Sequence, residues 1–309
     1  MGLALLFPGQ GSQFVGMGRE LAEAFPEARD TFHEADEVLG FSLSRLMWEG
    51  PEEALTETRN AQPALLVHSI AVHRVLGDAV AGARHAAGHS LGEFSAYVAA
   101  GSLTFADGLR AVRRRGELMF ETGEARPGTM AAILGLDDHA VEAVCAAVTG
   151  GVCVPANFNA PGQVVVSGDQ TGVEEGMVRA REAGAKKVVP LNVSGAFHSP
   201  LMEPAEDGLA AHLEAVRFGD PRLEVYSNVT GRPVLTGQQA RDLLVRQLTS
   251  PVRWSASVAA MVEAGADRFL ELGPGAVLCG MNKRNARGVP CDAVGTPEQV
   301  EALLAGGEG

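Results

Sequence analysis

Short apolar runs that stop at glycine- or proline-containing turns recur along the chain and predict buried β-strands. Residues 3–7 (Leu-Ala-Leu-Leu-Phe) stop at Pro8-Gly9, and residues 268–272 stop at Gly273-Pro274-Gly275. Residues 84–88 lead into a further glycine turn, and residues 223–227 predict another strand. The spacing of these runs along the chain is typical of an α/β protein.

Helical spacing of apolar residues separates the strands. The first clear helix is expected from Pro63 to His73, with the proline in its first turn. Residues 105–120 predict a second, capped by Ser102 or Thr104. Later helices are expected over residues 201–215, 237–248 and 255–264.

Residues 128–192 follow a different order. Strands are expected at 129–134, 152–157, 163–167 and 187–192, with helices at 137–148 and 169–183. The order β-α-β-β-α-β is typical of a ferredoxin-like unit. We therefore expect an α/β fold in two parts: a large α/β-hydrolase-like domain with a parallel sheet (1–125 and 196–309) and an inserted ferredoxin-like subdomain (126–195).

The composition suits a cytoplasmic enzyme. The 309 residues are 46% hydrophobic and carry a net charge of −13, which argues against binding to nucleic acid or anionic membranes. No apolar run approaches the roughly 18 residues of a membrane span, and the first seven residues lack the basic segment of a signal peptide. Without CxxC spacing, the four cysteines are expected to be reduced structural thiols. They are Cys145, Cys153, Cys279 and Cys291.

The pentapeptide Gly88-His89-Ser90-Leu91-Gly92 fits a strand-to-helix elbow that presents a nucleophilic serine. Such a turn needs small residues on both flanks. Residues 91–100 then form an alanine-rich helical run that stops at Gly101. A tight turn without catalytic function is the alternative.

A serine nucleophile needs a base, and eight histidines are available. His198 lies in a polar junction, residues 194–200, where the chain returns to the large domain, so we expect it to face a cleft. A loop histidine at the surface is the alternative. His89 is adjacent to Ser90, and its side chain is expected to point away and to pack or hydrogen-bond locally.

Two further features are candidates for binding an anion. Arg115 lies on the flank of the apolar stripe of its helix, whereas Arg114 projects toward water. A semi-buried arginine needs a carboxylate, from either the protein or a substrate. The glycine-rich segment Pro8–Gln13 lacks phosphate-loop spacing, but its N–H groups can bind an oxyanion or form a plain turn.

Several motifs occur together and in order. They are Phe7-Pro-Gly-Gln-Gly-Ser-Gln13, Gln62-Pro63-Ala64, Gly88-His-Ser-Leu-Gly-Glu93, Arg115-Gly116, Asn157-Phe-Asn159 with Pro161-Gly-Gln163, Ala196-Phe-His198, Gln247-Leu248 with Pro251-Val252, and Glu271-Leu-Gly-Pro-Gly275. From about residue 3 to 285, the chain resembles the malonyl-CoA:acyl carrier protein transacylase family of fatty-acid synthesis.

The resemblance implies a role for each matching residue. Ser90 is the acyl-accepting nucleophile and His198 its base, oriented by the backbone carbonyl of Gln247. The N–H groups of Gln10 and Leu91 form the oxyanion hole, and Arg115 holds the malonyl carboxylate. Further substrate-binding residues are Gln62, Asn159, Met119 and Phe197, with Phe197 disfavouring an α-methyl group. Gly195 departs from the histidine often found there.

The same resemblance implies the substrates and partners. Malonyl-CoA donates the acyl group, an acyl carrier protein accepts it, and no metal or other cofactor takes part. An acidic carrier protein needs a basic docking patch, either Lys283, Arg284 and Arg287 or Lys186 and Lys187. A monomer is expected. A trans-acting polyketide acyltransferase, an α/β-hydrolase-type esterase and a catalytically silent carrier-binding module are the alternatives.

Overall fold

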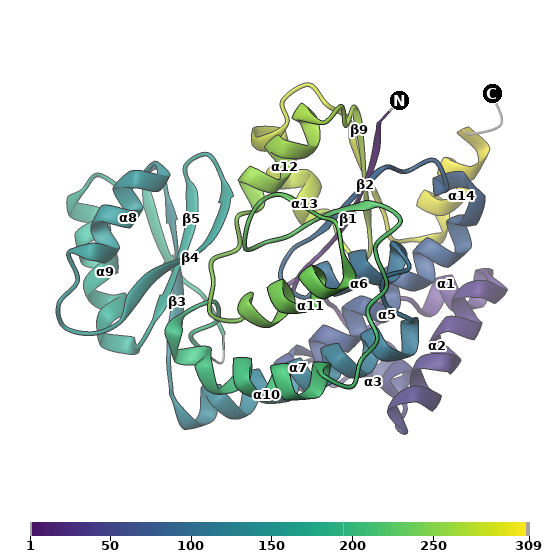
Figure 1. Ribbon diagram of the computed structural model, residues 1–309, viewed down its shortest axis with the longest axis horizontal. Helices are drawn as coiled ribbons and strands as arrows, with labels where there is room; N and C mark the ends of the chain where they lie inside the picture. The colour runs from purple at the N-terminus through teal and green to yellow at the C-terminus, as the bar shows by residue number, and fades with distance from the viewer. Residues whose placement is uncertain (1, 194, 307–309) are drawn as a thin grey trace.

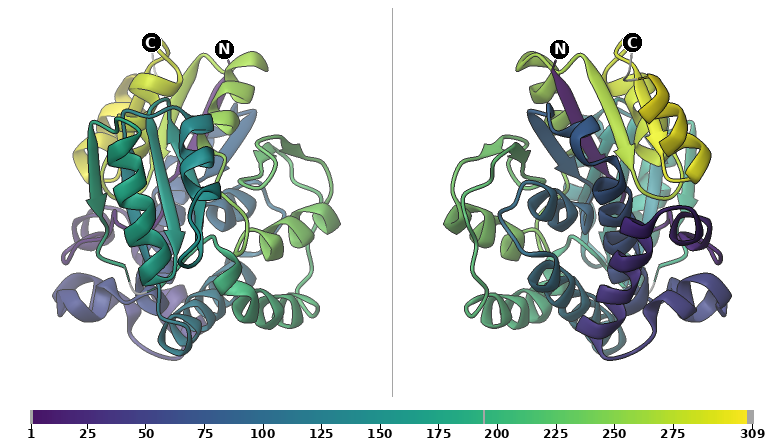
Figure 2. Two further views of the ribbon diagram at one scale, coloured as in Figure 1. Left: turned by 90° about the vertical axis from the view of Figure 1, so that its left-hand side faces the viewer. Right: turned by 90° about the vertical axis from the view of Figure 1, so that its right-hand side faces the viewer.

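Two β-sheets divide the strands of the protein in the computed structural model, which describes residues 2–193 and 195–306. Figure 1 shows the smaller sheet on the left, beside the larger one, and Figure 2 shows the same arrangement from both sides. Ser194 of the expected junction and residues 307–309 of the tail lie outside the described residues.

The larger sheet has the strand order β10-β9-β1-β2-β7-β8, and its strands are parallel except for β8, which pairs antiparallel with β7. This confirms the expected parallel sheet, while β8 and β10 were not predicted. The strands are β1 (Leu3–Phe7), β2 (His85–Gly88), β7 (Glu224–Tyr226), β8 (Pro233–Val234), β9 (Arg268–Leu272) and β10 (Cys291–Val294).

Both faces of this sheet are covered. Leu5 and Phe7 of β1 belong to one apolar cluster, whereas Ala4 and Leu6 between them belong to another. Because neighbouring side chains of a strand point to opposite faces, β1 is buried on both sides, which accounts for its continuous apolar run.

Helices supply both layers. Before the small sheet they are α1 (Arg19–Ala24), α2 (Pro26–Leu39), α3 (Leu43–Glu49), α4 (Glu52–Thr56), α5 (Thr58–Leu76), α6 (Gly92–Ala99) and α7 (Phe105–Ala125), with a 3-10 turn η1 (Gly77–Val80). After it they are η2 (Pro200–Met202), α10 (Glu203–Leu213), α11 (Gly237–Arg246), α12 (Trp254–Glu263), α13 (Val277–Asn285) and α14 (Pro297–Gly306). Thr104 caps α7, and this helix ends five residues later than predicted. The helices α13 and α14 were not predicted.

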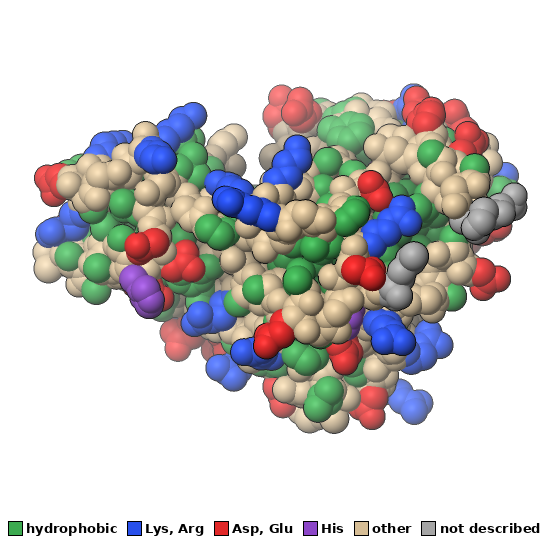
Figure 3. Space-filling model, turned by 90° about the horizontal axis from the view of Figure 1, so that it is seen from above, with side chains coloured by type: hydrophobic (Ala, Val, Ile, Leu, Met, Phe, Trp, Pro, Cys, Tyr) green, Lys and Arg blue, Asp and Glu red, His purple; other side chains and the backbone are tan. Residues whose placement is uncertain are grey.

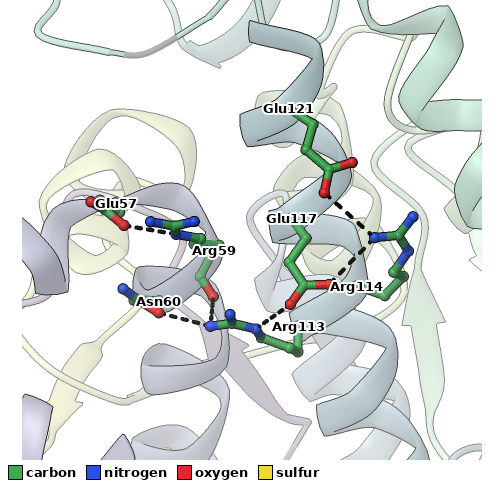
Figure 4. Close-up of polar contacts among 7 residues, drawn as sticks. All are labelled: Glu57, Arg59, Asn60, Arg113, Arg114, Glu117 and Glu121. Carbon is green, nitrogen blue, oxygen red and sulfur yellow. Dashed lines mark hydrogen bonds and ion pairs between the residues drawn. The ribbon is translucent and has the colours of Figure 1, made fainter. Parts of the chain in front are cut away.

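The expected position of Pro63 was wrong. It lies inside α5, which begins at Thr58. Proline has no N–H, so the carbonyl of Arg59 loses its helical donor. Arg113 of α7 donates to that oxygen at 3.0 Å and to Asn60 Oδ1 at 2.7 Å (Figure 4). A side chain from the neighbouring helix therefore replaces the missing bond and joins α5 to α7.

The smaller sheet is antiparallel, with the order β4-β5-β3-β6, and runs β3-α8-β4-β5-α9-β6 along the chain. Its elements are β3 (Thr129–Leu134), α8 (Asp138–Ala146), β4 (Cys153–Ala160), β5 (Gln163–Gly168), α9 (Gln170–Glu182) and β6 (Lys187–Pro190). The predicted order is confirmed, although β4 ends later and β6 earlier than expected. A separate apolar cluster fills the space between this sheet and its two helices.

A short backbone contact connects β4 to the chain beyond α11. Val252 donates to the Ala156 carbonyl at 2.8 Å, and Phe158 donates to the Val252 carbonyl at 2.9 Å. These bonds fix the small sheet against the segment that follows Gln247.

The prediction of four reduced thiols was wrong for one pair. Cys279 of α13 and Cys291 of β10 form a disulfide with Cα atoms 5.3 Å apart. The prediction failed because it came from spacing alone, and α13 with β10 brings these two residues together. Cys145 and Cys153 are free and buried.

Among the described residues, no helix combines the length and the apolar character needed to cross a membrane. The cytoplasmic location stays a prediction.

Candidate active site

The elbow at Ser90 is built by close approach of β2, β1 and α6. Ser90 has a φ of +52°, in the left-handed region that L-residues seldom occupy. A Cβ on Gly88 would lie 1.9 Å from the carbonyl carbon of Gly92, and a Cβ on Gly92 would lie 2.2 Å from the Phe7 carbonyl oxygen. Both flanking glycines are therefore required by the crossing of the backbones.

His198 lies against the serine. Its Nε2 is 2.9 Å from Ser90 Oγ, and its Nδ1 is 2.9 Å from the backbone oxygen of Gln247. A carbonyl oxygen only accepts, so Nδ1 carries the proton and Nε2 is free to accept one from the serine. Burial, together with the charge of Arg115, lowers the pKa of His198 to about 3, so the ring is neutral at physiological pH.

Arg115 is fully buried beside both. Its Nη2 donates to Ser90 Oγ at 3.0 Å and to Gln247 Oε1 at 2.9 Å, and its Nη1 donates to Gln62 Oε1 at 2.7 Å. Burial lowers the pKa of Arg115 to about 10, which leaves it charged. Among the described residues no carboxylate forms an ion pair with it, and its Nε has no hydrogen-bond partner. The site thus holds a buried cation bonded only to neutral oxygens.

A cavity of about 190 Å³ opens in front of these groups. Met130 of β3 and Asn157 of β4 line it together with residues that follow β1 and β2, so it lies between the two parts of the molecule. The lining residues are Gln10, Gly11, Gln13, Thr56, Gln62, His89, Ser90, Leu91, Arg115, Met119, Met130, Asn157, Leu191, Asn192, Val193, Phe197 and His198. Every sequence-predicted site residue except Asn159 and Gln247 is among them, and Gln247 contacts the site from behind.

The expectation for Asn159 needs correction, whereas the His89 ring packs and forms a hydrogen bond as expected. Asn157, not Asn159, lines the cavity, because the pairing of β4 with β5 shifts register twice around these residues. Asn159 Oδ1 instead lies 2.8 Å from His89 Nε2. His89 also packs near Trp254, with ring centroids 5.7 Å apart. Its partners are therefore distant in sequence rather than local.

Gln10 lies in the segment after β1, Leu91 directly follows Ser90, and both residues border the cavity. Gly9 allows this approach, because a Cβ there would lie 2.6 Å from the His89 carbonyl oxygen. Leu91 immediately precedes α6, where backbone N–H groups point outward from the helix start. Gln62 Nε2 also donates to Met119 Sδ at 3.2 Å.

Two residues of the site were not predicted from sequence. Asn228 Oδ1 accepts from the Ser90 N–H at 2.7 Å, and its Nδ2 donates to the Gly88 carbonyl at 2.7 Å. Glu93, fully buried, accepts from Asn228 and Gln247. Glu93 is the last residue of the Gly88–Glu93 motif, so the sequence did point to it. Asn228 follows β7, and only the pairing of β7 with β2 brings it to the same sheet edge as Ser90.

Among the described residues, no group of three or more histidine, cysteine, aspartate or glutamate side chains is arranged to hold a metal ion.

Comparison with known proteins agrees with this geometry. The acyl transferase domain model matches residues 4–301. The malonyl CoA-acyl carrier protein transacylase of Bacillus subtilis is 47% identical over 98% of this chain and 96% of its own length. The chain belongs to this acyltransferase family.

Other members are similar over nearly their whole length. The transacylase of Escherichia coli K12 is 44% identical over 97% of this chain and 98% of its own. The acyl carrier protein S-malonyltransferase of Vibrio cholerae superposes with a TM-score of 0.93 at 43% identity, covering 98% of this chain and all of that one. A malonyl-transacylase solved with its type II PKS acyl-carrier protein gives 0.94 at 42% identity, covering 99% and 100%.

Proposed function

We propose that this enzyme transfers the malonyl group of malonyl-CoA to the phosphopantetheine thiol of an acyl carrier protein through a malonyl-serine intermediate. The observation that carries the proposal is the position of Ser90 Oγ, 2.9 Å from a neutral imidazole nitrogen and 3.0 Å from a buried guanidinium. A nucleophile beside a base is suited to acyl transfer, and the adjacent cation is suited to an acyl group that carries a carboxylate.

In the first half-reaction, Ser90 Oγ attacks the thioester carbonyl while His198 Nε2 takes the hydroxyl proton. The N–H groups of Gln10 and Leu91 donate to the oxygen that becomes negative. The tetrahedral intermediate collapses, the C–S bond breaks, and His198 returns the proton to the CoA thiolate. The Gln247 carbonyl keeps the ring in the required tautomer throughout.

In the second half-reaction, the carrier-protein thiol gives its proton to His198 and attacks the malonyl ester. The C–O bond to Ser90 breaks, and His198 protonates the serine oxygen. Because CoA leaves the malonyl-serine before the carrier-protein thiol reacts, the kinetics are expected to be ping-pong.

Selectivity for a dicarboxylic acyl group follows from Arg115. A malonyl carboxylate gives the guanidinium a bidentate charged partner, whereas an acetyl group leaves it with neutral oxygens. Gln62 accepts from the guanidinium through its Oε1 and donates to Met119 Sδ through its Nε2. Phe197 borders the same cavity, and we expect its bulk to disfavour an α-methyl group.

We assign the two parts of the fold to an α/β-hydrolase-like domain (1–125 and 196–309) and a ferredoxin-like subdomain (126–195). The separate apolar cluster of the small sheet supports this division. So does the strand order β4-β5-β3-β6.

The carrier protein is expected to dock beside the cavity on a basic surface. Lys283, Arg284 and Arg287 are exposed on or just after α13, and Lys186 and Lys187 are exposed at the start of β6. Arg284 donates to Gln163 of β5, so the first set extends to the small sheet. Figure 3 shows Lys and Arg side chains on both sides of the hollow between the two parts of the molecule. An acidic partner complements this surface.

The malonyl group can serve either fatty-acid or polyketide synthesis. The relative solved with a type II PKS acyl-carrier protein supports a polyketide role as the alternative to fatty-acid synthesis. Transfer rates to the two kinds of carrier protein distinguish them.

The test isolates the two half-reactions. Wild-type enzyme is incubated with malonyl-CoA, freed from CoA by gel filtration, and mixed with holo-carrier protein. We expect malonyl to move to the carrier protein, and mass spectrometry of both proteins follows it. An apo-carrier protein, which lacks the thiol, is the control. Release of free malonate without transfer identifies an esterase and contradicts the proposal.

A further inference from the structure

A carboxylate lies directly beneath the elbow. Glu93, in the first turn of α6, is 0% exposed. Its Oε2 accepts from the Asn228 N–H at 3.0 Å and from Gln247 Nε2 at 2.6 Å, and its Oε1 accepts from the Tyr97 hydroxyl at 3.4 Å. Burying a carboxylate is costly unless it is hydrogen-bonded, and these three donors offset part of that cost.

One of its partners holds the nucleophile. The Asn228 side chain accepts from the Ser90 N–H and donates to the Gly88 carbonyl, both at 2.7 Å. It therefore bonds the backbone on each side of His89 and supports the left-handed conformation of Ser90.

The other partner holds the base and the cation. The Gln247 backbone oxygen accepts from His198 Nδ1, and its Oε1 accepts from Arg115 Nη2, each at 2.9 Å. Its Nε2 also donates to the Ser90 carbonyl at 3.1 Å.

We propose that Glu93 is a positioning residue for acyl transfer, whose ionised carboxylate fixes Asn228 and Gln247 and thereby sets the nucleophile, the base and the acyl-binding arginine relative to one another. This inference rests on the proposed function.

The carboxylate also supplies charge. Glu93, Gln247 and Arg115 form a chain from anion through amide to cation, in which each hydrogen bond polarises the next. Glu93 acts electrostatically on Arg115, which has no carboxylate in direct contact among the described residues. A protonated Glu93 would lose this charge and turn one acceptor oxygen into a donor.

Glu93 is expected to change charge near neutral pH. Burial raises the pKa of Glu93 to about 7, partly offset by the bonds from Asn228, Gln247 and Tyr97 and by the charge of Arg115. The charged or titratable groups that act on it are Tyr97 from its own helix and Arg115 from α7. The pKa of Tyr97 is raised and that of His198 is lowered to about 3, so neither changes charge near neutrality.

The test is single-turnover acylation of the full chain by malonyl-CoA and by acetyl-CoA, followed by intact mass after acid quench. For wild type, the rate is expected to rise with pH through about 7, as Glu93 ionises, for both substrates. In Glu93→Gln this rise is expected to be absent, and acylation to be about 10- to 100-fold slower, as misplaced reacting groups cause. Glu121→Gln, a surface carboxylate on α7, is the matched control and should behave as wild type.

The outcomes separate the two proposals. A wild-type enzyme that forms no acyl-enzyme would overturn the proposed function and this inference with it. A wild type that is acylated, with Glu93→Gln equal to it in rate and pH profile, overturns this inference alone. Should Glu93→Gln not fold, Tyr97→Phe removes one donor to the carboxylate and is expected to move the rise to higher pH. An unmoved rise in Tyr97→Phe then overturns the inference.

Discussion

Individual residues of the site store conformational strain. Ser90 and His198 are the two non-glycine residues described with positive φ, +52° and +58°. Such conformations cost about 1–3 kcal/mol each and persist where surrounding bonds hold them. Asn228 bonds the backbone N–H of Ser90, and the Gln247 carbonyl bonds the ring of His198. The two strained residues are the ones that meet at 2.9 Å.

Arg115 is expected to determine which acyl group the enzyme accepts. Arg115→Ala is expected to reduce malonyl transfer strongly, by about 10²-fold or more, because the charged partner of the acyl carboxylate is lost. Transfer of acetyl is expected to be spared or improved, since a neutral acyl group makes no such bond. Rates measured with both acyl-CoAs check this, and equal loss for both would refute the selectivity role.

The elements meet at backbone contacts too close for any side chain. At Gly88 a Cβ would clash with the backbone of Gly92, which cannot move without displacing α6. Gly88→Ala is therefore expected to destabilise the fold by about 1–3 kcal/mol and to abolish acylation. Gly280→Ala in α13, where a Cβ meets open space, is the matched control and should stabilise by about 0.5–1 kcal/mol. Urea unfolding of both variants measures this. Equal stability of the two variants would argue against the close crossing.

Regular elements were predictable where a local signal marks them. Thr104, one of the two expected caps, accepts from the first turn of α7. Asp137 and Asp169 cap α8 and α9 in the same way. Pro63 misled the prediction because Arg113, distant in sequence, replaces its missing donor. The salt-bridged turns of α7 around Arg113 (Figure 4) are likewise tertiary features.

The site was predictable to the extent that motifs carry it. Ser90, His198 and Arg115 were found from the elbow, the junction and the helix face, and the structure brings them together. Asn228 has no local signal, because its role depends on β7 pairing beside β2. The register shifts of β4 that bring Asn157 rather than Asn159 to the cavity are also invisible in the sequence.

The whole molecule buries several histidines in the neutral state, which ties its stability to pH. Burial lowers the pKa of His68 to about 4 and that of His198 to about 3. In the unfolded chain both would protonate below about pH 6.5. Each therefore reduces the free energy of unfolding by up to about 1.4 kcal/mol per pH unit below that value. Glu93 and Glu271, whose pKa values are raised, act in the opposite direction.

The variant His68→Gln isolates the contribution of His68 to the pH dependence of stability. His68 Nε2 bonds the Gly295 carbonyl, and neither residue lines the cavity. His68→Gln retains a donor and does not titrate. Between about pH 7.5 and 5.5, it is expected to lose about 1.4 kcal/mol less stability than wild type. Urea unfolding at the two pH values measures the difference. Identical losses would show that His68 is not held neutral.

The central claim is that Ser90 carries the acyl group. The most direct measurement is peptide mapping by mass spectrometry after brief exposure of wild type and Ser90→Ala to malonyl-CoA. We predict one malonyl group on the peptide that contains Ser90 in wild type, and none in the variant. A malonyl group on another residue, or one that persists in Ser90→Ala, would contradict the account.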